Sequence, residues 1–255
     1  MFEEALALLP NTSSWILYLT CALLIGMSKT GIQNIGSLAV PLFVILFGAK
    51  YSTGIVLILL ALADLMGVIY YRKQLIWSEV LKLLPMSLMG LTVALIIGKY
   101  IDDTSFKIVM GACIILGIGI MFWMEKLDKT KQLIITNGKW YSPLFGFIMG
   151  FSTMIGNAAG PALSVYLLTK NLNKYAFVAT GAWFIMILNY IKIPLQVFVW
   201  QNVSWVGVLL NFMALPFIIL GGVLGIKLVK ILPEKEFRII ITAMVIISCV
   251  LMILI

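Results

Sequence analysis

The sequence predicts an all-α polytopic membrane protein made of two inverted-topology repeats of about five hydrophobic segments each. Three observations support this: an extreme apolar composition, long apolar runs, and residues that recur at constant spacing in the two halves. Of the 255 residues, 62% are hydrophobic and only 11% are charged, whereas soluble domains carry about 25% charged residues. A soluble core of this length could not bury so much apolar surface, so we expect the bilayer to surround most of the chain.

The spanning elements are expected to be helices. In lipid every backbone polar group needs a partner, and a helix satisfies its own groups within one segment. A transmembrane β-barrel would instead show alternating segments of about ten residues. The sequence has continuous apolar runs, such as 55–63, 91–98 and 239–255, which favour helices.

Ten apolar segments are present, and several are short. They cover residues 13–27, 36–48, 53–70, 80–98, 105–124, 141–154, 161–169, 175–191, 204–228 and 236–255. A full span needs about 20 residues, and the second, sixth and seventh segments fall short of that length. We therefore expect the first two segments of each repeat to form a broken or re-entrant helical hairpin, with full spans as the open alternative.

The two halves of the sequence repeat each other. The polar linker 125–139 separates the first repeat, 1–124, from the second repeat, 140–255. An offset of 120 aligns Gly26, Gly36, Pro41 and Lys50 with Gly146, Gly156, Pro161 and Lys170, and an offset of 131 aligns Pro85, Gly90 and Lys99 with Pro216, Gly221 and Lys230. Matches of glycine, proline and lysine arise by chance less readily than matches of leucine or isoleucine, so we interpret them as a true repeat.

The basic residues predict the orientation in the membrane. With the N-terminus outside, the inside segments hold most lysines and arginines, including Arg72, Lys73 and the lysines of the linker. The positive-inside rule then places both termini outside and the linker in the cytoplasm of a multi-pass protein of the cytoplasmic (inner) membrane. Five segments per half is an odd number, so the halves have opposite topology. Many secondary transporters share this architecture and bind substrate near the midplane between the repeats.

Residue types that carry enzyme or metal chemistry are scarce. The sequence has no histidine, and Cys21, Cys113 and Cys249 stand apart inside apolar runs, so neither a metal site nor a disulfide framework is predicted. Motifs of nucleotide hydrolysis, zinc proteases and serine hydrolases are missing. We therefore expect no enzymatic activity and no cofactor. We also expect no nucleic acid partner, because lysines in the loops explain the net charge of +8. Active transport would have to use an ion gradient, a substrate gradient or the membrane potential.

Two Gly-rich breaks at matching repeat positions, 26–41 and 146–161, form the candidate substrate site. Glycine lets the chain unwind and lets backbone N–H groups approach a ligand, and the N-terminus of a half-helix favours an anion. Close packing of membrane helices on small residues is the alternative for either break alone. The residues expected to bind substrate here are Ser28, Lys29, Thr30, Gln33, Asn34, Ser37, Ser152, Thr153, Gly156 and Asn157.

Charged side chains in apolar surroundings add further candidates. Lys29 either supplies positive charge to an anion or marks the cytoplasmic end of the first segment. Asp64 lies in the apolar run 57–70, where a carboxylate is costly. It is either a coupling residue, which carries a proton or pairs with Lys29, or a polar contact between helices. Asn189 and Lys192 share one helical face and are expected at the site, unless Lys192 extends toward the interface.

With these residues in view, the sequence resembles the sulfite exporter TauE/SafE family, also called the toluene sulfonate uptake permease superfamily. The resemblance covers residues 12–255 and rests on the paired breaks with Pro41 and Pro161, on Tyr71-Arg-Lys-Gln-Leu-Ile-Trp77 followed by Pro85 and Gly90, and on Ala179-Thr180 leading to Asn189 and Lys192. It implies secondary transport of a small sulfur-containing anion: sulfite, a sulfonate such as sulfoacetate, or thiosulfate.

The leading hypothesis is therefore a secondary transporter of such an anion. It would work by alternating access, with substrate bound near the midplane between the two breaks. An uncoupled anion channel with the same site is the alternative, and a membrane scaffold or an intramembrane enzyme is a third class. The expected partners are the anion and the lipid bilayer, and a homodimer is an open possibility for assembly.

Overall fold

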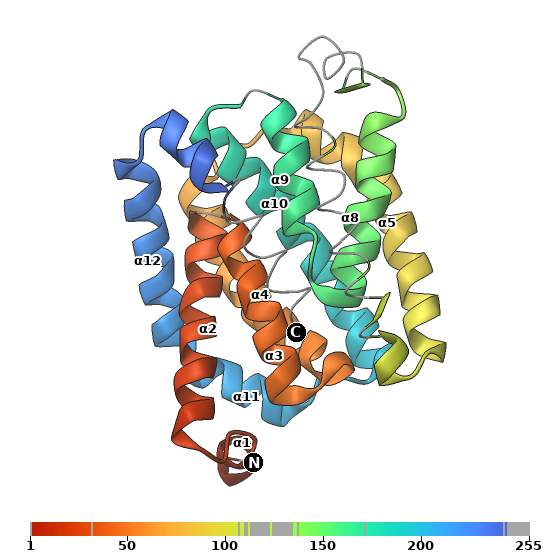
Figure 1. Ribbon diagram of the computed structural model, residues 1–255, viewed down its shortest axis with the longest axis vertical. Helices are drawn as coiled ribbons and strands as arrows, with labels where there is room; N and C mark the ends of the chain where they lie inside the picture. The colour runs from red at the N-terminus through yellow and green to blue at the C-terminus, as the bar shows by residue number, and fades with distance from the viewer. Residues whose placement is uncertain are drawn as a thin grey trace.

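The computed structural model describes residues 2–31, 33–106, 138–170 and 172–241, together with positions 108, 109, 112, 123, 135, 136 and 243. All regular structure in this part of the chain is helical (Figure 1), so the all-α prediction is confirmed. In chain order the elements are α1 (Phe2–Ala7), α2 (Thr12–Thr30), the 3₁₀ helix η1 (Gln33–Leu38), α3 (Ala39–Phe47), α4 (Ala49–Tyr71), α5 (Trp77–Tyr100), α8 (Tyr141–Gly156), α9 (Gly160–Thr169), α10 (Lys174–Leu195), the π-helical turn η2 (Gln196–Trp200), α11 (Trp205–Met213) and α12 (Leu215–Ile231). The predicted segments 105–124 and 236–255 and the linker 125–139 fall largely outside the described residues.

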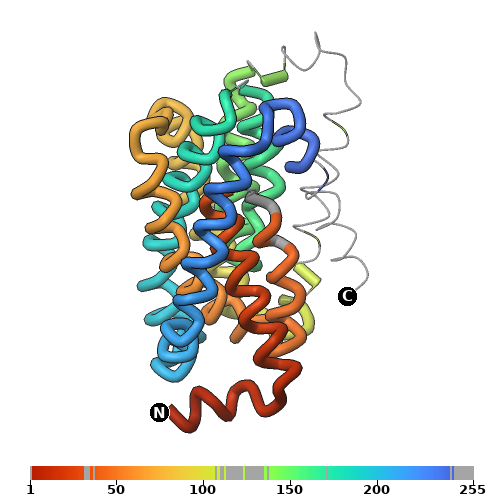
Figure 2. Tube along the Cα trace, turned by 90° about the vertical axis from the view of Figure 1, so that its left-hand side faces the viewer, coloured from red at the N-terminus to blue at the C-terminus, as the bar shows by residue number. Residues whose placement is uncertain are grey.

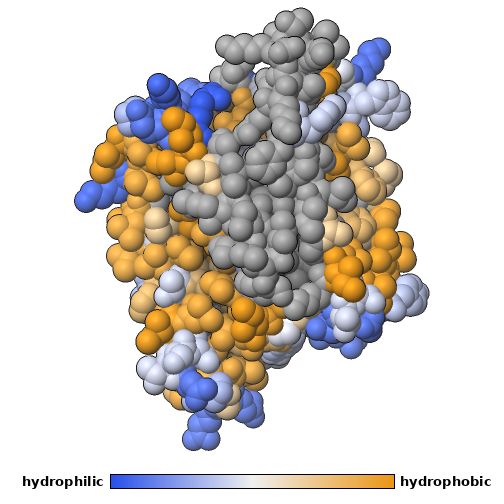
Figure 3. All heavy atoms as spheres, in the orientation of Figure 1, coloured by the Kyte–Doolittle hydropathy of each residue, from blue (hydrophilic) through white to orange (hydrophobic). Residues whose placement is uncertain are grey.

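Among the described residues, three helices are long and apolar enough to cross a membrane. They are α4, α5 and the continuous helix formed by α10 and η2. Figure 3 shows apolar side chains around the middle of the molecule and hydrophilic side chains at its two ends, as expected for a protein that lies in a bilayer.

The predicted single segment 204–228 is divided into two helices. α11 and α12 meet at Ala214 with a bend of 53°, and together they make a fourth candidate span. Pro216 lies in the first turn of α12, where its missing N–H removes a hydrogen bond to the preceding turn. Continuous hydropathy does not reveal this bend, although the proline does.

Two helical hairpins open at opposite ends of the molecule. In the first, the outer parts of α2 and α3 lie together toward the N-terminal end, where the Tyr18 ring meets Phe43 and Phe47 with centroids 5.8 and 6.2 Å apart. In the second, α8 and α9 have their outer ends together, because the hydroxyls of Tyr141 and Thr169 share a 3.2 Å hydrogen bond. η1 and Gly31 form the tip of the first hairpin, and residues 157–159 form the tip of the second.

Each hairpin packs against a helix from the other half of the chain. α8 lies along α5, and α2 lies along α12, as Figure 2 shows for the red and blue tubes. The contacts depend on glycine: a Cβ on Gly90 would overlap the Phe147 carbonyl oxygen, and a Cβ on Gly221 would overlap that of Leu23. These two glycines are the pair that the offset of 131 aligns. α4 and α10 pack against each other in the centre.

The two ends of the molecule differ in charge. At the basic end, Lys170 and Lys82 approach Glu79 at 3.9 and 2.6 Å, and the Lys174 Nζ atom donates to the Leu232 carbonyl at 2.6 Å. At the opposite, N-terminal end, the Asp103 carboxylate accepts a 2.8 Å hydrogen bond from the backbone N–H of Lys50. Figure 1 shows the N-terminus and α11 at that same end.

The glycine contacts between α5 and α8 and between α12 and α2 give a stability prediction. Gly90→Ala and Gly221→Ala should each lower the free energy of unfolding in detergent by about 1–3 kcal/mol, because the added methyl must displace a neighbouring backbone. Gly207→Ala is the matched control, since the nearest atom to its added Cβ is the Ser204 hydroxyl at 3.2 Å. Equal unfolding profiles for all three variants would contradict the close approach of these helices.

Candidate functional site

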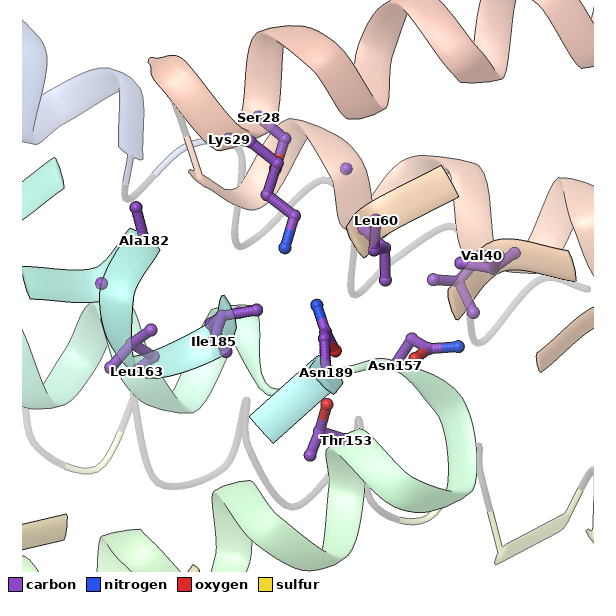
Figure 4. A pocket seen from close by; sticks show the side chains of 14 residues that line it. Ser28, Lys29, Val40, Leu60, Thr153, Asn157, Leu163, Ala182, Ile185 and Asn189 are labelled. Carbon is purple, nitrogen blue, oxygen red and sulfur yellow. The ribbon is translucent and has the colours of Figure 1, made fainter. Parts of the chain in front are cut away.

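A cavity of about 50 Å³ lies between the two hairpin tips. Both Gly-rich breaks and the central helices α4 and α10 contribute to its wall, which consists of Ser28, Lys29, Gly36, Val40, Val56, Leu60, Thr153, Asn157, Gly160, Leu163, Gly181, Ala182, Ile185 and Asn189. One water needs roughly 10–15 Å³ on this measure, so the space suits a few waters or one small oxyanion. Figure 4 shows the Lys29 amino group pointing into this space from α2, opposite Asn189 and Thr153.

Lys29 is held by a carboxylate at the edge of the cavity. Its Nζ atom lies 2.7 Å from the Asp64 Oδ1 atom. The other carboxylate oxygen, Oδ2, accepts a 2.7 Å hydrogen bond from the Asn189 side-chain amide. Asp64 is fully buried, and side chains from two other helices approach its two oxygens, Lys29 as an ion-pair partner and Asn189 as a hydrogen-bond donor.

Lys192 continues this network toward the second hairpin tip. Its ammonium donates to the Asn189 Oδ1 atom at 3.2 Å, the Thr153 hydroxyl at 3.1 Å and the Asn157 Oδ1 atom at 2.5 Å. An ammonium has three N–H donors, and here all three meet neutral oxygens. Lys192 is fully buried, so it faces the site and does not extend toward the interface.

We call this series of contacts the polar chain: Lys29, Asp64, Asn189, Lys192, Thr153 and Asn157. It runs from one hairpin tip to the other through α4 and α10. Local structure places its members. Asn189 and Lys192 are three residues apart on α10. Asn157 directly follows the last residue of α8 and has φ 53°, a left-handed conformation that asparagine tolerates well. Asn157 also donates to the Thr53 carbonyl at 3.1 Å, which ties the second tip to the start of α4.

The polar chain places two lysines and one carboxylate away from bulk water. Two ammonium groups and one carboxylate give a net charge of +1 if all three are ionised, and their residues are at most 8% exposed. Buried charge is costly in a membrane and marks function by default. Two lysines face a single carboxylate in this network, and this excess of basic groups suits an anion. Within the described residues, no group of three or more potential metal ligands occurs.

The structure brings several predicted site residues together. Ser28, Lys29, Thr153, Asn157 and Asn189 line the cavity. Asp64 and Lys192 do not line the cavity themselves. They form an ion pair or hydrogen bonds with residues that do.

Other predicted residues have different contacts or lie outside the described part. The Thr30 hydroxyl donates to the Gly222 carbonyl at 2.7 Å, which joins α2 to α12. The Ser152 hydroxyl donates to the Met149 carbonyl of its own helix at 3.3 Å, and Gly156 ends α8 outside the cavity wall. The side chains of Gln33, Asn34 and Ser37 lie outside the described residues, although their backbone belongs to η1.

The sequence prediction missed most of the apolar and glycine lining. Gly181 had a detectable signal, because Thr53-Gly54 and Thr180-Gly181 match at an offset of 127. Thr53 accepts a 2.8 Å hydrogen bond from Asn202, in the loop after α10. Thr180 accepts a 3.2 Å hydrogen bond from the Ile76 N–H, in the loop after α4. Thr53 and Thr180 therefore mark equivalent contacts: α4 meets the loop that follows α10 and η2, and α10 meets the loop that follows α4.

A family model described as Sulfite exporter TauE/SafE matches residues 18–252, nearly the whole chain and both breaks. The chain belongs to this family. The TauE/SafE family consists of transporters, so membership identifies a multi-pass membrane transport protein and not an enzyme, and it indicates a sulfur-containing anion as substrate. Comparisons with curated proteins and with solved structures gave no match.

The Lys29–Asp64 pair in this TauE/SafE protein gives a second stability prediction. Lys29→Met or Asp64→Asn alone should cost about 3–5 kcal/mol, because each leaves a buried charge without its partner. The double variant should lose clearly less than the sum of the single losses. Denaturant unfolding in detergent of the four proteins measures the difference, and strictly additive losses would show that the two side chains do not interact.

Proposed function

We propose that this protein is a secondary transporter that moves a small sulfur-containing anion across the cytoplasmic membrane by alternating access. The observation that carries the proposal is the cavity between the two hairpin tips. Lys29 lines this cavity together with Thr153, Asn157 and Asn189 from the other half of the chain. Substrate would bind there, near the midplane, with Ser28, Lys29, Thr153, Asn157 and Asn189 as its immediate partners. Lys192 would position three of these, Thr153, Asn157 and Asn189, through its hydrogen bonds.

The chemistry of the wall suits an oxyanion. Lys29 offers a charged donor, the Ser28 and Thr153 hydroxyls and the Asn157 amide offer neutral ones, and the net positive charge of the polar chain favours a negative ligand. Hydrogen bonds to ionised groups are about twice as strong as neutral ones. The apolar wall formed by Val40, Leu60 and Leu163 excludes water and strengthens these interactions. The space is suited to a small oxyanion, and membership of the TauE/SafE family favours sulfite, thiosulfate or a small sulfonate among these.

The arrangement of helices supports alternating access through inverted repeats. We assign residues 1–124 to the first repeat, 125–139 to a cytoplasmic linker and 140–255 to the second repeat. The reciprocal packing of α5 on α8 and of α12 on α2 is what a twofold relation between repeats would produce. Hairpins that open at opposite ends suit a mechanism in which each tip in turn closes one side of a central site.

Transport by purified protein in liposomes tests the substrate site. Wild-type protein should take up sulfite or a small sulfonate with saturating kinetics. Lys29→Gln should weaken anion binding about 10- to 150-fold, the equivalent of losing one charged hydrogen bond of about 1.5–3 kcal/mol, and Asn157→Ala should also impair uptake.

Lys230→Gln is the matched control for the lysine substitution. Lys230 lies at the basic end, with its amino group 5.5 Å from the centre of the Tyr70 ring, and its removal should leave anion affinity unchanged. Intact transport in both Lys29→Gln and Asn157→Ala would refute the site assignment. Flux that never saturates would favour an anion channel.

The proposed orientation has its own test. In a variant without the three native cysteines, we expect a cysteine at Asp102, at the N-terminal end, to react with a membrane-impermeant maleimide in intact cells. A cysteine at Lys73, near the basic end, should react only after the membrane is opened. Both positions are exposed in the structure, so the reverse pattern would overturn the placement of both termini outside.

A further inference from the structure

Lys29 has two possible partners in the proposed transporter. Its ammonium lines the cavity and also pairs with the Asp64 Oδ1 atom at 2.7 Å. Asp64 is fully buried and does not itself line the cavity. An anion that binds to Lys29 would therefore compete with the Asp64 carboxylate for the same positive charge.

The charges around the cavity restrict what can bind. With Lys29, Asp64 and Lys192 all ionised, the site has a net charge of +1, so one monoanion makes it neutral. A dianion would leave an excess negative charge, with Asp64 and the substrate close together in a medium that hardly screens them. A proton on Asp64 removes that repulsion and frees Lys29 for the substrate.

Few other ionisable groups can alter this balance. Lys192 and Tyr190 of α10 act on Asp64 electrostatically, together with Lys29 of α2. On α12, which also packs on α4, Lys227 and Lys230 lie in the last turns, toward the basic end. α3 and α11 contain no titratable side chain.

We propose that Asp64 is an internal counter-ion which the substrate replaces at Lys29, and that Asp64 takes up one proton when the substrate is a dianion. The transported unit then has a net charge of minus one: a monoanion alone, or a dianion with one proton. The proton binds the carboxylate as the anion enters from one side. It leaves on the other side, when the anion departs and the Lys29–Asp64 pair forms again. This inference rests on the proposed function and adds the proton as a second transported species.

The experiment uses two anions that do not titrate near neutral pH. Liposomes with wild-type protein and an internal pH dye receive thiosulfate, a dianion, or methanesulfonate, a monoanion. Thiosulfate uptake should bring in about one proton per anion, and methanesulfonate uptake should bring in none. Asp64→Asn should take up thiosulfate without protons, whereas Glu79→Gln, which removes a buried carboxylate outside the cavity, should keep the wild-type ratio.

Each outcome separates this inference from the proposed function. Proton uptake with thiosulfate that is unchanged in Asp64→Asn would overturn the role of Asp64, although the protein would still be a transporter. Failure of wild-type protein to move either anion would overturn both proposals. Because Asp64→Asn is expected to be less stable, proton uptake on thiosulfate binding is also measured with wild-type protein in detergent, by calorimetry in buffers of different ionisation enthalpy. Binding without proton uptake would refute the proposal.

Discussion

The pairing of Lys29 with Asp64 is the interaction on which the centre of this protein depends. Both charges lie away from bulk water, and the Asp64 carboxylate, which is fully buried, depends on neighbouring side chains for its partners. The Asp64 carboxylate uses one oxygen for Lys29 and the other for Asn189, and Asn189 in turn holds Lys192. Lys192 also donates to Thr153 and Asn157 at the end of α8, so these contacts join α2, α4, α10 and α8 around one cavity. The polar chain determines both the geometry of the cavity and its positive charge.

Close backbone packing makes this centre possible. The hairpin tips contain irregular backbone, which a membrane protein tolerates only where protein or a cavity covers it. Glycines at the α2–α12 and α5–α8 contacts bring helices of the two halves together, so that each tip is enclosed by neighbouring elements such as α9 beside η1. Hydrogen bonds such as that from Thr30 to the Gly222 carbonyl then join the enclosing helices. Close packing at the glycines thus encloses the hairpin tips around the buried Lys29–Asp64 pair.

Much of this was predictable from the sequence, because hydropathy and charge report directly on a bilayer. The apolar segments match α2, α4, α5, α8, α9 and α10 within a few residues. Each Gly-rich break contains a hairpin tip, but residues 26–30 and 146–156, which were expected to be part of the breaks, are helical. Contacts of hydroxyl groups were harder to predict. Thr30 and Ser152 were expected at the substrate but bond to backbone carbonyls, a competition that short hydroxyl side chains often meet in helices. Whether a hydroxyl group faces the substrate or a backbone carbonyl depends on which helix lies opposite. The spacing of residues within one segment does not contain that information. The apolar lining was missed for the same reason.

The first hairpin has a consequence for how the protein is made. Its tip is covered by α9, and α2 is covered by α12, so the protective surfaces come from the half of the chain that is synthesised last. During synthesis the N-terminal half emerges first, with Thr30 still without its partner on α12. The Lys29–Asp64 pair, by contrast, lies entirely within the half that is already present. The Lys29–Asp64 contact can therefore form early, whereas the contacts of the first hairpin with α9 and α12 can form only once the second half is present.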